Sequence, residues 1–117
     1  RASFLRLPYV QMTSQHFGVD DGSSRFYNQV VNAGRVQRDW QSAEVMMRPD
    51  GLYRWGALID HNPDHEPGAG SCIFLHIWRG SGKSTSGCTA MSEENLLRVI
   101  RWLDPAKQPR MAQFVWR

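Results

Sequence analysis

A histidine and a cysteine that lie twelve residues apart are the side chains of this chain best suited to covalent chemistry. His76 ends the largely apolar run 71–76, and Cys88 follows the small or polar residues 85–87. A cysteine attacks as its thiolate, and a histidine that accepts the thiol proton makes the thiolate available near neutral pH. The pair therefore predicts a nucleophile, Cys88, and its general base, His76.

The second cysteine, Cys72, lies inside the apolar run. Four residues of extended strand place it about 13 Å from His76, which is beyond hydrogen-bond reach. We therefore expect Cys72 to be a buried, inert thiol, and only Cys88 to be a partner for His76. Two cysteines are too few for a disulfide framework, so both are expected to be thiols.

The base and the nucleophile must be positioned by ordered elements. Residues 72–78 predict a strand whose even-numbered side chains, including that of His76, share one face. Both faces are largely apolar, which indicates a strand near the centre of a sheet. Residues 79–84 are a loop by their Gly and Ser content, and a tight turn at 85–87 would direct successive backbone N–H groups at an oxyanion.

The segment after Cys88 predicts an amphipathic helix. Ser92 is a suitable N-cap, Glu93 and Glu94 suit the first turn, and the residue before Pro105 ends the helix. The expected inner face consists of Leu96, Val99, Ile100 and Leu103. We expect a mainly β fold, a curved mixed sheet or β-sandwich, with this one main α-helix at about residues 92–104 packed on it.

Three further expectations concern the rest of the chain. Residues 1–24 are expected to be irregular, with the fold starting near Arg25, because turn-forming residues dominate the stretch 18–24. Residues 43–59 predict a β-hairpin around a Pro-Asp-Gly turn. Residues 111–116 predict a last strand.

Composition bounds the class of protein. The chain of 117 residues with 41% hydrophobic residues is expected to form a single domain, residues 1–117, with a packed core. The formal charge of +3 is spread without a basic cluster, so no nucleic-acid partner is expected. No apolar stretch reaches the roughly 18 residues of a membrane span, and we expect a monomer without an integral membrane segment. Arg1 begins the chain without an initiator Met or a signal-peptide pattern, as in a processed or trimmed fragment.

Two segments imitate ligand sites. Residues 80–85 resemble a phosphate-binding loop, but Ile77 stands where its first glycine belongs and residues 86–88 stand where its helix should begin, so no nucleotide is expected. Residues 60–66 carry two histidines among carboxylates, but Pro63 forbids the helix that would align them on zinc. A solvated acidic loop is the better interpretation, and we expect no metal and no organic cofactor.

Residues 68–76 and 85–91 together resemble the catalytic domain of the L,D-transpeptidase (YkuD-like) family, in a divergent branch with Thr-x-Gly-Cys in place of Ser-His-Gly-Cys. The resemblance covers residues 18–116, and residues 1–17 are expected to be an irregular N-terminal segment. It extends to Asp20-Asp21, Tyr27-Asn28, the hairpin ending near Asn62 and the helix Glu93 to Leu103.

The resemblance implies acyl transfer on peptidoglycan stem peptides. Cys88 would attack the L-centre carbonyl between meso-diaminopimelate and the terminal D-alanine, form a thioester and release D-alanine. His76 would take the thiol proton and later protonate the leaving amine, and the N–H groups of Gly87 and Cys88 would bind the oxyanion. The thioester would then pass to an amine or to water. The implied location is extracytoplasmic, in the periplasm or cell wall of a bacterium.

The chain departs from the common pattern of that family after the histidine and around the cysteine. Ile77-Trp78 replaces Gly-Thr, Ser86 replaces a histidine, and Ala90 replaces an arginine or asparagine. Arg79 is a candidate anchor for the donor's carboxylate, or simply a solvated loop residue. Thr85 and Ser86 are further candidates for orienting the substrate.

The group that orients His76 is left open between two candidates. Asn62, or a backbone carbonyl near the strand end, would accept from the second ring nitrogen, and Asn62 is equally suited to capping a loop. The reaction is also left open. The alternatives are an L,D-carboxypeptidase or other hydrolase, a secreted cell-wall-targeting effector with the same chemistry, and, from another class, a non-catalytic wall-binding module.

Overall fold

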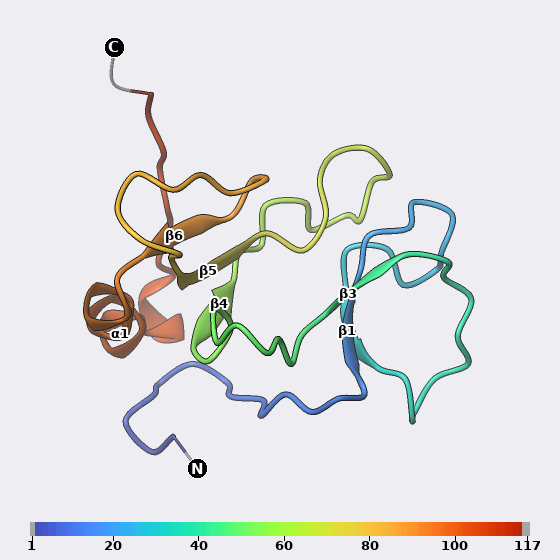
Figure 1. Cartoon of the computed structure of the whole chain (residues 1–117), viewed down its shortest axis with the longest axis horizontal. Helices are drawn as coiled ribbons and strands as arrows, with labels where there is room; N and C mark the ends of the chain where they lie inside the picture. The colour runs from blue at the N-terminus through green and yellow to red at the C-terminus, as the bar shows by residue number, and fades with distance from the viewer. Residues whose placement is uncertain (1, 116–117) are drawn as a thin grey trace.

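The computed structural model describes residues 2–115 and arranges their strands in two small three-stranded sheets (Figure 1). The first sheet has the antiparallel order β2-β1-β3, from β1 (His16–Val19), β2 (Val30–Asn32) and β3 (Ala43–Val45). The second has the order β4-β5-β6, from β4 (Gly56–Leu58), β5 (Phe74–Ile77) and β6 (Thr89–Met91). Helix α1 (Glu93–Trp102) and the short 3-10 helix η1 (Pro105–Lys107) follow. The fold is therefore mainly β with one α-helix.

The central strand of the first sheet, β1, lies in a segment predicted to be irregular, so that prediction is wrong for residues 16–19. Its Gly18 belongs to the stretch 18–24, whose residue types predict a turn. A Cβ on Gly18 would lie 3.1 Å from the Cys72 sulfur, so the glycine marks a close approach of two chain segments inside a strand. The turn predicted after it does form, because Asp21 accepts from the backbone and hydroxyl of Ser23.

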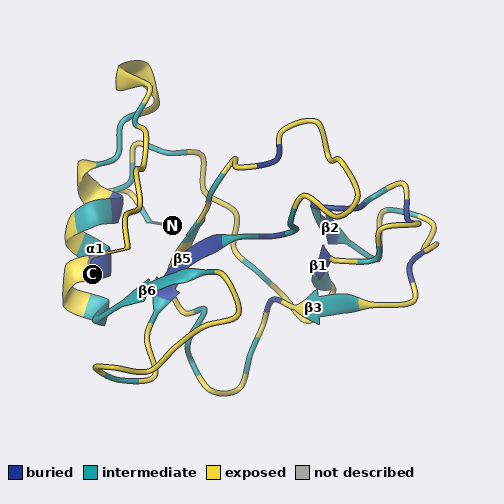
Figure 2. Cartoon of the chain, turned by 90° about the horizontal axis from the view of Figure 1, so that it is seen from above, coloured by how far each residue is buried: buried dark blue, intermediate teal, exposed yellow. Residues whose placement is uncertain are grey.

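The second sheet is mixed, because β5 pairs antiparallel with β4 and parallel with β6. Strand β5 is central and buried on both faces, as predicted (Figure 2). One face packs Leu75 against α1, where Leu96 is fully buried beside Ile100. Phe74 packs on the other face in a separate cluster with Met46 and Cys72.

Helix α1 confirms the helix predicted after the cysteine. The Ser92 hydroxyl accepts from Asn95 N at 3.3 Å and so caps the first turn. The helix covers the side of the second sheet that faces away from the first (Figures 1 and 2). No helix within residues 2–115 is long and apolar enough to cross a membrane.

The hairpin predicted for residues 43–59 does not form. Its turn is present, since Asp50 accepts from Leu52 N, but a second turn at 52–55 follows at once. The chain therefore leaves the first sheet at β3 and enters the second at β4. Each strand pairs elsewhere, β3 with β1 and β4 with β5.

The strand predicted at 111–116 is absent over residues 111–115, and residue 116 lies outside the described residues. Gln108 adopts a left-handed conformation after η1. The segment then passes β6, where Gln113 donates to the Thr89 hydroxyl, and runs outward beyond it (Figure 1). Phe114 is 89% exposed. Because a strand needs a neighbouring ladder for its backbone groups, its apolar composition alone does not produce one.

A buried amide links the two sheets. Asn28, in a left-handed conformation just before β2, donates from Nδ2 to the Asn62 carbonyl at 2.8 Å. Its Oδ1 accepts from Cys72 N, also at 2.8 Å. Both partners belong to the segment that leads into β5, so this side chain sets where β5 begins relative to the first sheet.

We predict that Asn28→Ala lowers the free energy of unfolding by about 2–4 kcal/mol, because it leaves a buried N–H and a buried C=O without partners. Urea unfolding of the two proteins measures the difference. Asn95→Ala, on the exposed side of α1, is the matched control and should change stability by less than about 0.5 kcal/mol. Equal effects of the two substitutions would contradict a linking role for Asn28.

Candidate active site

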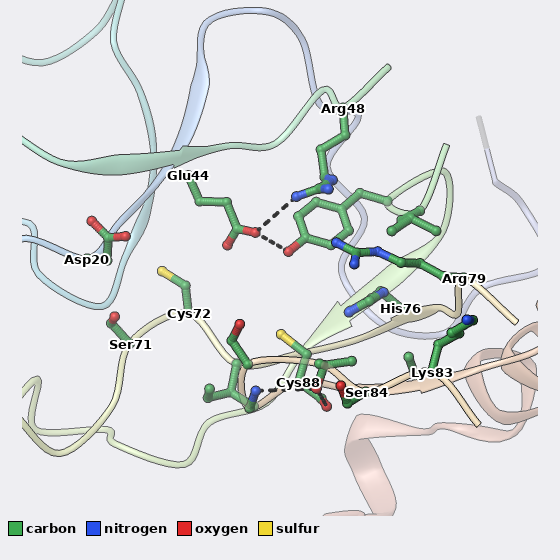
Figure 3. A pocket seen from close by; sticks show the side chains of 17 residues that line it. Asp20, Glu44, Arg48, Ser71, Cys72, His76, Arg79, Lys83, Ser84 and Cys88 are labelled. Carbon is green, nitrogen blue, oxygen red and sulfur yellow. Dashed lines mark hydrogen bonds and ion pairs between the residues drawn. The ribbon is translucent and has the colours of Figure 1, made fainter. Parts of the chain in front are cut away.

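A cleft of about 620 Å³ lies between the two sheets and contains both predicted catalytic side chains (Figure 3). His76 comes from β5 and Cys88 from the residue before β6. Glu44 on β3 contributes from the first sheet, and the loop 83–88 forms part of the rim. The cleft therefore takes its reactive groups from one sheet and part of its wall from the other.

The parallel pairing of β5 with β6 brings Cys88 and His76 to the same region. Thr89 is the Cα partner of Leu75, so one residue earlier Cys88 lies beside Phe74, whose N–H donates to the Cys88 sulfur at 3.4 Å. Cys88 is then diagonal to His76, which lies two residues further along β5 than Phe74. The structure records no hydrogen bond between these two described side chains. Such contacts often close only when substrate is bound.

The His76 imidazole is fixed by its own strand and is only 7% exposed. Its Nδ1 lies 2.7 Å from the Ile77 carbonyl oxygen. Because a carbonyl only accepts, Nδ1 carries the proton in this bond, and a neutral ring keeps its lone pair on Nε2. Figure 3 shows the far end of the ring directed toward the Cys88 side of the cleft. Of the two orienting groups considered, the backbone carbonyl is the one in place.

Asn62 has the other role considered for it, that of a loop cap. Its Nδ2 donates to the carbonyls of Glu66 and Gly70 at 3.0 Å each, and its Oδ1 accepts from Glu66 N at 3.1 Å. These bonds use the amide within the loop that precedes β5. Asn62 therefore shapes the approach to the strand and does not orient His76.

The Cys88 thiol is partly buried, and its pKa is raised above the ordinary value. Burial is the main cause, and the negative charge of Glu44 adds to it, whereas the Phe74 N–H lowers the pKa by stabilising the thiolate. A raised pKa favours the protonated thiol near neutral pH, in contrast to the available thiolate that the sequence predicts. The thiol is protonated at rest, so His76 would have to remove the proton during attack.

Cys72 is the buried, inert thiol that was predicted. It is 3% exposed, and burial raises its pKa to about 12. Its sulfur lies 3.8 Å from the carbonyl oxygens of Val19 and Gln29, in the contact between the sheets. The role of Cys72 is packing.

Thr85 holds the turn that presents Cys88. Its hydroxyl donates to the Cys88 carbonyl at 2.5 Å and accepts from Gly87 N at 3.3 Å. Gly87 has a φ of 152°, and a Cβ there would lie 3.3 Å from Ile73, so the turn requires glycine. The Gly87 N–H predicted to bind an oxyanion is thus engaged by Thr85. Ser86 is exposed on the rim.

Arg79 and Lys83 line the cleft from the loop between β5 and β6, and both are exposed. Arg79 lies on the His76 side (Figure 3). The loop that imitates a phosphate-binding motif runs into strand β6, and α1 begins only at Glu93. Among residues 2–115, no group of three or more His, Cys, Asp or Glu side chains is arranged to hold a metal ion.

Glu44 and Tyr53 are two of the pocket residues that sequence reasoning missed. The Tyr53 hydroxyl donates to Glu44 Oε1, and Arg48 approaches the same oxygen at 3.7 Å. The Tyr53 ring packs edge-on against His76 with a centroid separation of 5.1 Å. Burial and the Glu44 bond raise the pKa of Tyr53, so its hydroxyl remains a donor. The one available signal was a glutamate in the middle of a predicted strand.

We predict that iodoacetamide labels the native chain at Cys88 alone and that its rate is half-maximal above the ordinary thiol pKa of about 8.5. Peptide mass spectrometry across a pH series measures both. Glu44→Gln should move the midpoint to lower pH, because a charge that opposes the thiolate is removed. The control Glu94→Gln, on the exposed face of α1, should not. A wild-type midpoint below the ordinary value would instead show a resting thiolate.

The arrangement has the parts needed for acyl transfer: a thiol, a base oriented by a carbonyl and a cleft open to a peptide. Comparison with protein-family models, with curated proteins and with solved structures finds no match for the chain. The function is therefore argued from the site geometry and from the motif segments that carry it.

Proposed function

We propose that the chain is a cysteine acyltransferase of the L,D-transpeptidase type that acts on peptidoglycan stem peptides. The observation that carries the proposal is that Cys88, directly before β6, and His76, on the neighbouring parallel strand β5, line one cleft. The bond from His76 Nδ1 to the Ile77 carbonyl supports it, because that bond directs the basic nitrogen away from the strand. The segments 68–76 and 85–91 supply the resemblance to that family.

The first step is attack on the donor carbonyl. His76 Nε2 accepts the thiol proton as the Cys88 sulfur forms its bond to carbon, and the Phe74 N–H stabilises the developing thiolate. The Cys88 N–H donates to the negative oxygen of the intermediate. The Gly87 N–H can donate to it as well once it releases the Thr85 hydroxyl. His76 then protonates the leaving nitrogen, D-alanine departs, and a thioester remains on Cys88.

The proposal includes the finer fold and the location. We assign the second sheet and α1 to a core of the L,D-transpeptidase type, in which a mixed sheet carries the base and the nucleophile is followed by a helix. The first sheet would supply the opposite wall of the substrate cleft. Action on stem peptides requires an extracytoplasmic location, in the periplasm or cell wall.

Hydrolysis is a second candidate outcome of the same chemistry. Residues 81–87 beside the nucleophile are all exposed, so water can reach a thioester on Cys88. A carboxypeptidase, or a secreted effector that trims stem peptides, would result. Product masses with and without an added D-amino acid distinguish the two, because only a transferase incorporates the amine.

A wall-binding module without catalysis is favoured by one observation. The Cys88 thiol has a raised pKa and makes no hydrogen bond to His76, although both are described. A binding module would keep the cleft without the acyl-enzyme. Formation of the thioester is therefore the decisive readout.

We predict that incubation with a disaccharide tetrapeptide releases D-alanine, and that incubation with a carbapenem gives a mass adduct on Cys88. Cys88→Ala should abolish both, and His76→Gln should slow both by about a hundredfold or more, because it removes the base. Intact-mass spectrometry and an assay for free D-alanine measure the outcome. Wild-type protein that gives neither product would leave the binding module as the better account.

We predict that Arg79→Ala raises KM for the tetrapeptide by about tenfold with little change in kcat, because it removes binding to the donor's carboxylate. Arg98→Ala is the matched control, since Arg98 pairs with Glu94 on the exposed side of α1. An unchanged KM in Arg79→Ala would remove Arg79 from the site and leave it a solvated loop residue.

A further inference from the structure

Tyr53, a side chain of the connection between β3 and β4, packs on the face of β5 that carries the candidate base. It contacts two alternate residues of that strand, Phe74 with a ring-centroid separation of 5.5 Å and His76 with one of 5.1 Å. Alternate residues of a strand share a face, so the phenol covers one face of β5. Both Tyr53 and His76 line the cleft.

The Tyr53 phenol is also held by groups outside β5. Its hydroxyl donates to Glu44 Oε1 on β3, and the Arg48 guanidinium lies 5.1 Å from the centroid of its ring. Arg48 is itself fixed, because it pairs with Asp50 at 2.5 Å and approaches the same Glu44 oxygen at 3.7 Å. The ring is therefore held at its hydroxyl and over its face, and it presents a fixed wall to the imidazole.

The hydrogen bonds of His76 do not by themselves fix its ring. The Ile77 carbonyl holds Nδ1 at 2.7 Å, and no hydrogen bond to Nε2 is recorded among residues 2–115. One bond at one ring atom leaves the imidazole free to swing about that atom, or to turn over and exchange Nδ1 for a carbon. Packing must exclude these alternatives. Within the described residues, the contact with Tyr53, at an interplanar angle of 65°, is the one aromatic contact recorded for the ring.

We propose that Tyr53 is a positioning residue for the general base. Its ring keeps the His76 imidazole in the orientation that places Nδ1 on the Ile77 carbonyl and leaves Nε2 for the thiol proton of Cys88. This orientation can be measured without a substrate, whereas its consequence for acyl transfer rests on the proposed function. Proton transfer to Nε2 slows steeply when the base is displaced, because the two atoms must come within hydrogen-bond distance.

The first test observes the imidazole directly in protein with isotope-labelled histidine. A long-range proton–nitrogen correlation spectrum of the neutral ring distinguishes a proton on Nδ1 from one on Nε2, and the His76 signals are those lost in His76→Gln. We expect the Nδ1 tautomer alone in the wild-type protein. Tyr53→Leu, which removes the ring, should raise the share of the Nε2 tautomer, whereas Tyr53→Phe, which keeps the ring, should retain the Nδ1 tautomer.

The second test measures release of D-alanine from the disaccharide tetrapeptide. Tyr53→Leu should lower kcat by about tenfold or more with little change in KM, because the loss lies in proton transfer and not in substrate binding. Tyr53→Phe should lower kcat by no more than about threefold, since its ring can still pack against His76 after the bond to Glu44 is lost. The conservative variant therefore separates the ring from the hydroxyl.

Phe26→Leu is the matched control for the loss of a packed aromatic ring. Phe26 is half-buried, meets Trp40 edge-on at 5.9 Å and packs on the core of the first sheet. Thermal unfolding checks that each variant is folded, and both leucine variants should be less stable than the wild type. Phe26→Leu should nevertheless leave the His76 tautomer and kcat unchanged. If Tyr53→Leu does not fold, Tyr53→Met, with a flexible side chain of similar reach, takes its place in both tests.

The Nδ1 tautomer alone in Tyr53→Leu, or the same change of tautomer in Phe26→Leu, would overturn the positioning role. Equal losses of kcat in Tyr53→Phe and Tyr53→Leu would also overturn it, because the hydroxyl and not the ring would then be responsible. A change of tautomer in Tyr53→Leu without D-alanine release by the wild type would keep Tyr53 as the group that orients His76 and reject the acyltransferase. Release by the wild type with no change of tautomer in Tyr53→Leu would do the opposite.

Discussion

The position of the cleft depends on one buried side chain, the amide of Asn28. It accepts from Cys72 N and donates to the Asn62 carbonyl, so a residue of the first half of the chain satisfies two backbone groups of the second half. Few residues tolerate the left-handed conformation that this requires, and asparagine is one of them. Because β5 begins at Phe74, two residues after Cys72, the same bonds fix His76 relative to the first sheet. Tyr53 can then pack against the histidine and donate to Glu44 of the first sheet.

The parts of the fold that follow from local sequence could be predicted, and those that depend on distant partners could not. Helix α1 has its cap, its acidic first turn and its apolar stripe within one short segment, and it forms as expected. The strand with His76 is likewise evident from its continuous apolar run. The hairpin prediction is wrong because two segments with strand-like sequences and a turn between them do not determine whether the strands pair with each other. The turn predicted at Gly18 is wrong for a related reason. The glycine leaves room for the side chain of Cys72, a residue far along the chain.

The candidate site divides in the same way. Cys88 and His76 could be identified as candidates from residue type alone, because their side chains are reactive. Their position at one cleft follows from the pairing of β5 with β6. The sequence predicts that a backbone carbonyl could orient His76, but it does not identify that carbonyl as the one of Ile77. Glu44 could not be found, because its importance comes from facing Tyr53 and the thiol across the cleft. A single glutamate in a strand is usually solvent-facing.

The electrostatics of the cleft are better suited to a thiol that is activated by its ligand than to one that is permanently ionised. Burial and Glu44 oppose the thiolate, and only one backbone N–H favours it, so the protonated form is the resting state. A protonated thiol reacts more slowly than a thiolate with oxidants and with adventitious electrophiles. The Nδ1 bond to Ile77 keeps His76 aligned while it is neutral, which is the form that accepts a proton. In the proposed acyl transfer, the substrate would have to draw Cys88 toward Nε2, and the exposed residues 81–87 form the rim beside it.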